Sequence, residues 1–307
     1  MYERFYGLTR KPFALTPDPD FLYLSKQHSH ALATLRYGLM TGAGITVITG
    51  EVGSGKTTLI RRVMRQLDVD ATVGLITNTH KGFRDLLGWM LGSFGIKATS
   101  KDPVQRYDQF VAFLAQQNAR GQPVILMIDE AQNLNPPQLE ELRLLSNLNL
   151  AEGTSLQLIL VGQPELAATL SRHDLRQFSQ RIAVEYEIEP LDHGQTSEYI
   201  AYRLGVAGGS PETFDADACS AIYFHSRGIP RLINNICDLG LVYGFGEGRA
   251  LIGIDVIQTV MKGKKISGHR SVAGDASEGI VQPVRVALKE RTGIDVACIA
   301  GLANGTA

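Results

Sequence analysis

The stretch GEVGSGKT, residues 50–57, carries the residue types that bind a nucleoside triphosphate. It fits the pattern GxxxxGK[ST], in which glycines let backbone N–H groups curl around a phosphate, a lysine reaches the β and γ oxygens and a hydroxyl holds Mg²⁺. An apolar run at 45–49 precedes it and a helical pattern follows from Lys56, the strand–loop–helix context that such a site needs. The sequence therefore predicts a nucleotide site with bound Mg²⁺. Its expected contacts are Gly50, Glu51, Val52, Gly53, Ser54, Gly55, Lys56, Thr57 and Thr58, with Thr57 also a metal ligand.

A second motif, VILMIDEAQ at residues 124–132, ends an apolar strand in two acids, Asp129 and Glu130. In open α/β sheets ligands sit at the carboxyl ends of the strands, so both carboxylates are expected at the nucleotide. Asp129 fits the carboxylate that organises Mg²⁺, and Glu130 fits the base that polarises a water for attack on the γ-phosphate. A small-molecule kinase must keep water away from that phosphate, whereas an ATPase needs such a base. The Asp-Glu pair therefore favours hydrolysis.

Two further polar residues are candidates for sensing the γ-phosphate. Gln163 ends the run at 156–162 and could orient the attacking water, or could equally be a turn residue before Pro164. Arg231 follows Pro230 at a predicted helix start. A cation there opposes the helix dipole and costs stability unless it has another purpose.

Two arginines, Arg176 and Arg181, lie just before the last strand-like run at 183–189. Either could be an arginine finger that reaches the γ-phosphate of a neighbouring subunit, or both could form a solvated helix face. A finger is worth about 10³–10⁵ in rate, enough to make hydrolysis depend on assembly.

Apolar strands that alternate with helical patterns must position these residues. Because this alternation is typical of a parallel sheet covered on both faces, we expect an α/β fold with a five-stranded parallel sheet. After residue 190 strand signals stop and helical patterns continue, which predicts a small helical domain. The expected strands are 45–49, 71–77, 123–129, 156–162 and 183–189, and the expected helices are 28–42, 56–66, 82–94, 107–117, 136–148, 164–170, 196–204, 215–225, 230–243 and 255–261.

The expected domain organisation has four parts. Residues 1–42 form a strap rich in aromatics and proline, followed by a helix. Residues 43–190 form the α/β core, and residues 191–263 the helical lid, with Asp215 and Asp255 as N-terminal caps or first-turn acids. Residues 264–307 are polar and Gly/Ser-rich at first and carry little periodicity, so they are expected to be a mobile tail.

Composition restricts partners and location. The chain of 307 residues has 30 basic and 31 acidic side chains, so no bulk charge attracts it to a polyanion or an anionic membrane. Three widely spaced cysteines indicate incidental thiols of a reducing compartment. The N-terminus lacks the apolar region of a signal peptide and no run reaches the ~18 apolar residues of a membrane span. We expect a cytoplasmic protein, recruited to the inner membrane only by a partner.

The order of these motifs resembles the AAA+ superfamily of P-loop NTPases. More narrowly, FYGLTRKPFALTPDPDFLYLS, GEVGSGKTTL, ILMIDEAQNL, LILVGQPEL, LRQFSQRI and GIPRLINNICD are similar to the ExeA family, which includes general secretion pathway protein A, pilus-biogenesis ATPases and ATPases of exopolysaccharide and PEP-CTERM export loci. The resemblance covers residues 1 to about 262. Full-length members continue into a transmembrane helix and a peptidoglycan-binding domain, so this sequence resembles a short form.

The resemblance implies a role for each matching residue. Lys56 and Thr57 become the ATP and Mg²⁺ ligands, Asp129 and Glu130 the Walker B pair. Gln163 becomes the sensor 1 candidate and Arg231 the sensor 2 residue that contacts the γ-phosphate from the lid. The finger fits Arg181 better than Arg176, because the arginine just before the last core strand is the usual place, but the choice stays open.

Two functions remain as hypotheses. The first is an oligomeric ATPase that couples ATP turnover to assembly or regulation of a secretion, pilus or polysaccharide-export apparatus. The second is a DNA-associated AAA+ protein similar to transposition target selectors. Two basic clusters favour the second, although both could be solvated charges: Arg61, Arg62 and Arg65, and Lys262, Lys264, Lys265, His269 and Arg270. Near-zero net charge and the lack of a helix-turn-helix or zinc signature favour the first.

Overall fold

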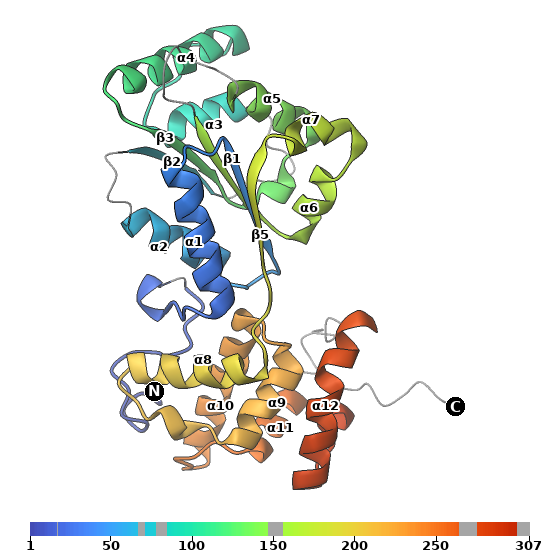
Figure 1. The fold of residues 1–307 in the computed structure, drawn as a ribbon. Helices are drawn as coiled ribbons and strands as arrows, with labels where there is room; N and C mark the ends of the chain where they lie inside the picture. Colours follow the sequence, from blue (N-terminus) through green and yellow to red (C-terminus); the bar gives the residue numbers. More distant parts are fainter. Residues whose placement is uncertain (17, 67–70, 78–84, 147–155, 264–274, 300–307) are drawn as a thin grey trace. The chain divides into compact units, whose positions relative to one another are not determined.

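The computed structural model describes residues 1–16, 18–66, 71–77, 85–146, 156–263 and 275–299. The chain forms two compact units (Figure 1). The α/β unit comprises residues 26–51 and 56–189. The helical unit comprises residues 1–25, 52–55 and those from 190 onward.

The α/β unit is built on a five-stranded parallel sheet, as the sequence predicted. The strand order is β2-β3-β4-β1-β5, and every neighbouring pair is parallel. Each strand end lies within one residue of its predicted bound, because each strand is a short, mostly apolar run. The strands are β1 Ile45–Gly50, β2 Thr72–Ile76, β3 Val124–Ile128, β4 Gln157–Gly162 and β5 Ile182–Ile188.

Helices cover both faces of this sheet (Figure 1). The helices α2 and α6 have the predicted bounds, 56–66 and 164–170. The helix α4, Pro103–Ala119, is longer than the predicted helix at 107–117. Predicted helical residues 82–84 and 147–148 lie outside the described residues. The helices of this unit are α1 Lys26–Met40, α2 Lys56–Gln66, α3 Leu86–Ser93, α4 Pro103–Ala119, α5 Pro136–Ser146, α6 Pro164–Leu170 and α7 Arg176–Ser179, with the short 3-10 turns η2 Ala131–Asn133 and η3 His173–Leu175.

Alternate residues of β1 face the two sides of the sheet, as extended backbone requires. Ile45 and Val47 lie in a buried core with residues of α3 to α7. Thr46 and Ile48 are also buried. A Cβ on Gly38 of α1 would lie 2.7 Å from Thr46 Oγ1, so this second side of β1 faces α1. β1 is thus buried on both of its sides, and its carboxyl end is where a ligand could approach it.

The helical unit has its own hydrophobic core. As expected, Asp215 caps α9 by accepting the Ala218 N–H at 2.6 Å, and Asp255 lies in the first turn of α11. Asp192 and Gln195 form a reciprocal capping box at the start of α8. The helices are α8 His193–Val206, α9 Ala216–Ser226, α10 Pro230–Gly246, α11 Ile254–Gly263, α12 Asp275–Thr292 and α13 Val296–Ile299, with 3-10 turns η1 Pro19–Phe21 and η4 Pro211–Thr213.

The N-terminal strap packs in the helical unit. Its aromatic residues, Tyr2, Tyr6, Phe13 and Phe21 among them, share the buried core of α8 to α11. The backbone N–H of Thr9 donates to Ala207 O at 2.8 Å, and the buried Arg203 guanidinium donates to Pro12 O at 2.5 Å. The strap and the following helix, which we expected to form one segment, therefore divide after residue 25.

The expectation of a mobile tail does not hold for residues 275–299, which form α12 and α13. Val281, Leu288 and Val296 are buried in the helical core. The Arg285 guanidinium binds both carboxylate oxygens of Asp295 at 2.8 Å, which holds the turn between the two helices. Gly279 and Pro283 interrupt the helical pattern in this sequence, which explains why periodicity missed it. Residues 264–274 and 300–307 lie outside the described residues.

In the part of the chain that the structure describes, no helix is long and apolar enough to span a bilayer.

Candidate functional site

The P-loop connects the end of β1 to the start of α2. Gly50 ends β1, and Thr57 and Thr58 lie in the first turn of α2. Glu51 and Val52 are exposed, whereas Ser54 is buried. Gly53 has φ +85°, which side chains rarely adopt.

Gly53 also leaves no room for a side chain. Residues 52–55 group with the helical unit, and there the Arg231 N–H donates to Gly53 O at 3.2 Å. A Cβ on Gly53 would lie 2.4 Å from the Cβ of Arg231. Glycine is therefore required at this position both by the turn and by the side chain of Arg231.

Lys56 is buried at the base of the loop. Its Nζ donates to Gly50 O at 2.7 Å and to Glu51 O at 2.8 Å, so it is held beneath the loop. Desolvation lowers the pKa of Lys56, and the negative charges of Glu130 and Asp129 act in the opposite direction. A desolvated cation among backbone amides is well suited to bind phosphate oxygens.

Thr57 and Asp129 supply the oxygens expected for a metal. Thr57 Oγ1 donates to Asp129 Oδ2 at 2.8 Å, and Asp129 is 6% exposed. The Asp129 N–H donates to Ile76 O at 2.9 Å. This hydrogen bond to the last residue of β2 fixes the backbone just after the end of β3. A hydroxyl and a carboxylate side by side are donors that Mg²⁺ accepts together with phosphate oxygens. The residues present therefore fit the ion.

Glu130 follows at the end of β3 in left-handed backbone, with φ 56° and ψ 38°. Its Oε2 accepts from Gln163 Nε2 at 3.1 Å and from Gln132 Nε2 at 2.6 Å. The Gln132 Oε1 accepts the backbone N–H of Gln163 at 3.1 Å. The structure thus brings Lys56, Thr57, Asp129, Glu130 and Gln163 to the same edge of one sheet. The sequence analysis did not predict Gln132 as a site residue. The signal that could have indicated it is an amide two residues after the pair Asp129 and Glu130.

The two finger candidates are placed differently. Arg176 begins α7, and Arg181 lies between α7 and β5. Both side chains are exposed. Within the described ranges, hydrogen bonds and ion pairs connect neither guanidinium to the P-loop or to Glu130. The structure does not choose between them.

Arg231 lies in the first turn of α10 and is exposed. The turn before it depends on Gly228, which has φ +75° and whose added Cβ would lie 1.8 Å from Leu191 O. Leu191 N–H in turn donates to Gly228 O at 3.0 Å. Backbone packing in the helical unit therefore fixes where α10 begins and where Arg231 is displayed.

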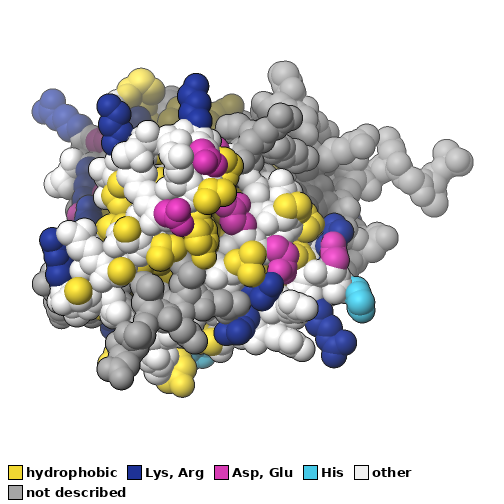
Figure 2. All heavy atoms as spheres, turned by 90° about the horizontal axis from the view of Figure 1, so that it is seen from above, with side chains coloured by type: hydrophobic (Ala, Val, Ile, Leu, Met, Phe, Trp, Pro, Cys, Tyr) yellow, Lys and Arg dark blue, Asp and Glu magenta, His cyan; other side chains and the backbone are white. Residues whose placement is uncertain are grey.

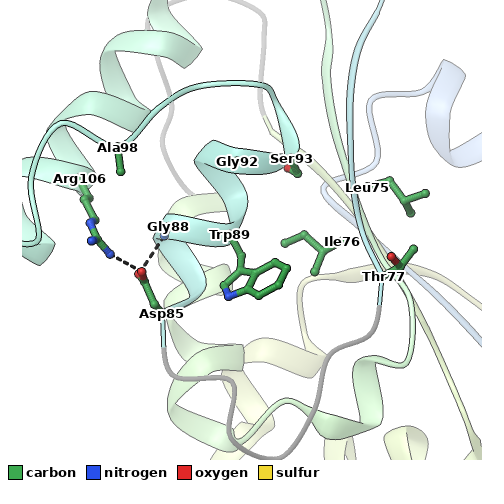
Figure 3. Close-up of a pocket in the computed structure, with 10 residues that line it drawn as sticks. All are labelled: Leu75, Ile76, Thr77, Asp85, Gly88, Trp89, Gly92, Ser93, Ala98 and Arg106. Carbon is green, nitrogen blue, oxygen red and sulfur yellow. Dashed lines mark hydrogen bonds and ion pairs between the residues drawn. The ribbon is translucent and has the colours of Figure 1, made fainter.

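A separate hollow of about 550 Å³ lies beside β2, between α3 and α4 (Figure 3). Trp89 projects into it from α3 and is 49% exposed. Asp85 caps α3 by accepting the Gly88 N–H at 3.0 Å and pairs with Arg106. None of the predicted site residues lines this hollow. Its lining is Leu75, Ile76, Thr77, Asp85, Gly88, Trp89, Gly92, Ser93, Ala98 and Arg106.

Comparison with known proteins agrees with this geometry. Residues 39–170 match the family model described as an AAA domain. General secretion pathway protein A of Aeromonas hydrophila is 41% identical over 249 residues, which are 81% of this chain and 46% of that protein. The chain thus spans about half the length of this curated relative.

Solved structures share the fold at low sequence identity. The Aeropyrum pernix ORC2 protein in its ADPNP–ADP complexes aligns with a TM-score of 0.61 at 13% identity, over 93% of this chain and 85% of that one. Cdc6p from Pyrobaculum aerophilum aligns with a TM-score of 0.63 at 16% identity, over 94% and 88%. These likenesses show the fold alone. The P-loop, the parallel sheet and the match over residues 39–170 identify an AAA domain in this chain, which is similar to general secretion pathway protein A.

Proposed function

We propose that the protein hydrolyses ATP, with Mg²⁺, and couples this turnover to the assembly or regulation of a secretion, pilus or polysaccharide-export apparatus. The single observation that carries hydrolysis is the placement of Glu130. Glu130 directly follows Asp129, the partner of Thr57, and its N–H donates to Asp129 Oδ1 at 3.0 Å. Its carboxylate accepts from Gln163 Nε2 at 3.1 Å. A kinase of small molecules has no need of this carboxylate.

Each side chain has a task in this mechanism. Lys56 would bind the β and γ oxygens of ATP, and Thr57 and Asp129 would hold Mg²⁺, which when bound would neutralise charge on those oxygens. Glu130 accepts a proton from water as that water attacks the γ-phosphate, and Gln163 orients the water or the carboxylate. Since exposed Arg176 or Arg181 would complete the site of a neighbour, we propose a nucleotide-dependent homo-oligomer.

The link to an export apparatus is supported by the likeness to general secretion pathway protein A, which is 41% identical over 81% of this chain and whose name places it in secretion. We propose membrane components of an export system as partners and recruitment to the membrane by one of them.

The DNA-associated alternative rests on basic side chains. Arg61, Arg62 and Arg65 lie on α2, whereas Lys264, Lys265, His269 and Arg270 lie outside the described residues. On the face seen in Figure 2, basic side chains form separate groups interspersed with acidic and hydrophobic ones. Nucleic-acid sites typically gather lysine and arginine on one surface. The coloured side chains on this face do not form such a surface, so the view gives the DNA-associated alternative no support.

The Glu130→Gln variant tests both levels of the proposal. We expect ATP to bind with unchanged affinity while turnover falls at least about a hundredfold, the scale of general-base catalysis. Single-turnover hydrolysis measures this directly. A variant that hydrolyses ATP at the wild-type rate would show that Glu130 is not the base.

The same variant, held in its ATP state, is the bait for identifying the partner. Affinity capture from a detergent-solubilised lysate should recover membrane export components, with Lys56→Met as the nucleotide-free control. Recovery of DNA together with salt-sensitive DNA stimulation of hydrolysis would support the alternative instead.

A further inference from the structure

One oxygen of the Glu130 carboxylate is held by two side-chain amides. Gln132 Nε2 donates to Oε2 at 2.6 Å, and Gln163 Nε2 donates to the same oxygen at 3.1 Å. The backbone of Glu130 is left-handed, which residues with a Cβ seldom adopt unless surrounding contacts impose it. The shorter of the two bonds comes from Gln132, so this residue contributes most directly to the direction of the carboxylate.

The amide of Gln132 is fixed at both ends. Its Oε1 accepts the Gln163 N–H at 3.1 Å, while its Nε2 faces the carboxylate. The two ends cannot exchange, because a flipped amide would place its oxygen against a carboxylate and its NH₂ against an N–H donor. Gly162 provides the space: an added Cβ there would lie 3.0 Å from Gln132 Oε1. One side chain thus joins the end of β3 to the end of β4.

The buried ammonium of Lys56 attracts the same carboxylate. Among the negative charges that raise the pKa of Lys56 against the effect of desolvation, Glu130 has the largest effect. Lys56 itself donates to the carbonyls of Gly50 and Glu51. A glutamate free to rotate toward the ammonium would form an ion pair, and its lone pairs would be less available to a water molecule. Amide donors at Oε2 oppose that rotation.

We infer that Gln132 is a positioning residue for ATP hydrolysis: it holds the Glu130 carboxylate in the direction needed to take a proton from water and ties it to Gln163. The inference rests on the proposed function of Glu130 as the base. It assigns to the amide of the DEAQ motif a role in catalysis that does not require contact with the nucleotide.

The main test is Gln132→Met, which keeps the length of the side chain and removes both ends of its amide. We expect kcat to fall about ten- to a hundredfold, the rate equivalent of one hydrogen bond to a charged group. The Kd for a fluorescent ATP analogue should change by less than about twofold, because only the reacting state uses the carboxylate. Gln132→Glu, which places a second carboxylate against Glu130, should lower kcat further.

A matched control is available six residues further on. Gln138 is buried, and its Oε1 accepts the Asn135 N–H at 2.9 Å at the start of α5. Gln138→Met removes an equivalent amide with a structural partner, so it should lower the Tm without lowering kcat. Thermal unfolding of both variants separates positioning from loss of stability.

A double-mutant cycle with Gln163→Met tests the link to β4. Because each single change already releases the carboxylate, the double variant should lose less than the product of the two single losses. Losses that multiply would overturn the link between the two amides.

The outcomes separate the inference from the proposed function. If the wild type hydrolyses ATP and Gln132→Met retains its kcat, or changes kcat only in proportion to its Tm as Gln138→Met does, the positioning role is wrong and the ATPase stands. If the wild type assembled with ATP and Mg²⁺ shows no hydrolysis, the proposed function fails and the positioning role fails with it.

Discussion

The carboxylates and the arginines of the candidate site are held in very different ways. Asp129 and Glu130 are each hydrogen-bonded within the α/β unit, by Thr57 and by two glutamine amides. Arg176, Arg181 and Arg231 are exposed. The acidic side is therefore preorganised by the fold of a single chain.

This difference indicates how turnover would be controlled. Preorganised groups need no reorganisation at the moment of reaction, so the acidic side is ready whenever nucleotide is present. Exposed arginines act only when something brings a phosphate to them. We infer that assembly controls whether the arginines reach a phosphate, whereas the carboxylates are in place in each chain. The following predictions test this difference.

The largest effect is expected for Arg181→Ala. If Arg181 is the finger, kcat falls about 10³-fold or more, because the guanidinium stabilises charge that develops on the transferred phosphoryl group. The specific activity of the wild type should also fall on dilution. Arg176→Ala is the matched control and should change kcat little; the reverse pattern would identify Arg176 as the finger.

Mixing provides the sharpest form of this test. If Arg181 is the finger, Arg181→Ala and Glu130→Gln should each have little activity, but a mixed assembly would contain sites with an intact base from one chain and an intact finger from the next. We expect mixing to restore part of the activity. Inactive mixtures, with a wild-type specific activity that is independent of concentration, would mean that no finger acts between chains.

Lys56→Met should have the next largest effect on activity. Lys56 belongs to the groups that are already in place within a single chain. Removing a charged donor to phosphate should lower kcat/KM about 10²- to 10³-fold, because ATP binding and charge stabilisation are both weakened. Titration with a fluorescent ATP analogue measures the binding part. This loss should be the same at all protein concentrations, whereas the Arg181 effect belongs to assembled protein only; a concentration-dependent loss would contradict this difference.

Arg231→Ala should produce the smallest change in kcat of these variants, and should lower activity while it raises stability. We expect kcat to fall roughly tenfold, as for one charged hydrogen bond. Stability should rise by about 0.3–1 kcal/mol, since a cation in the first turn opposes the helix dipole. Lys262→Ala is the control, because Lys262 lies in the last turn of α11 where a cation is favourable. An Arg231→Ala protein that is less stable would show that this side chain has a structural task.

Much of the fold follows from the sequence because its signals are local. The five strands are short apolar runs, and the P-loop glycines lie between one of them and an amphipathic helix. The strap was harder to place, because its aromatic and proline-rich sequence has no period. Its partners, such as Ala207 for Thr9, lie nearly two hundred residues away.

The candidate site shows the same limit. Lys56, Thr57, Asp129 and Glu130 are specified by motifs, since their spacing is set by a single loop or a single strand end. Gln132 was missed because its role depends on the left-handed turn at Glu130 and on a bond to a different strand. The helix α12 was missed for a similar reason, since only burial against the helical core compensates for its glycine and proline.

The packing of the strap has a consequence for how the chain folds during synthesis. Residues 26–189 contain the whole α/β unit, whereas the helical unit needs residues 1–25 together with those from 190 onward. At a synthesis rate of about 5–20 residues per second, roughly 10–40 s pass between synthesis of the strap and synthesis of the helices that it packs against. Tyr2, Tyr6, Phe13 and Phe21 are without their native core throughout that interval. These aromatic residues thus leave the ribosome before the α/β unit but are buried only after it has been synthesised.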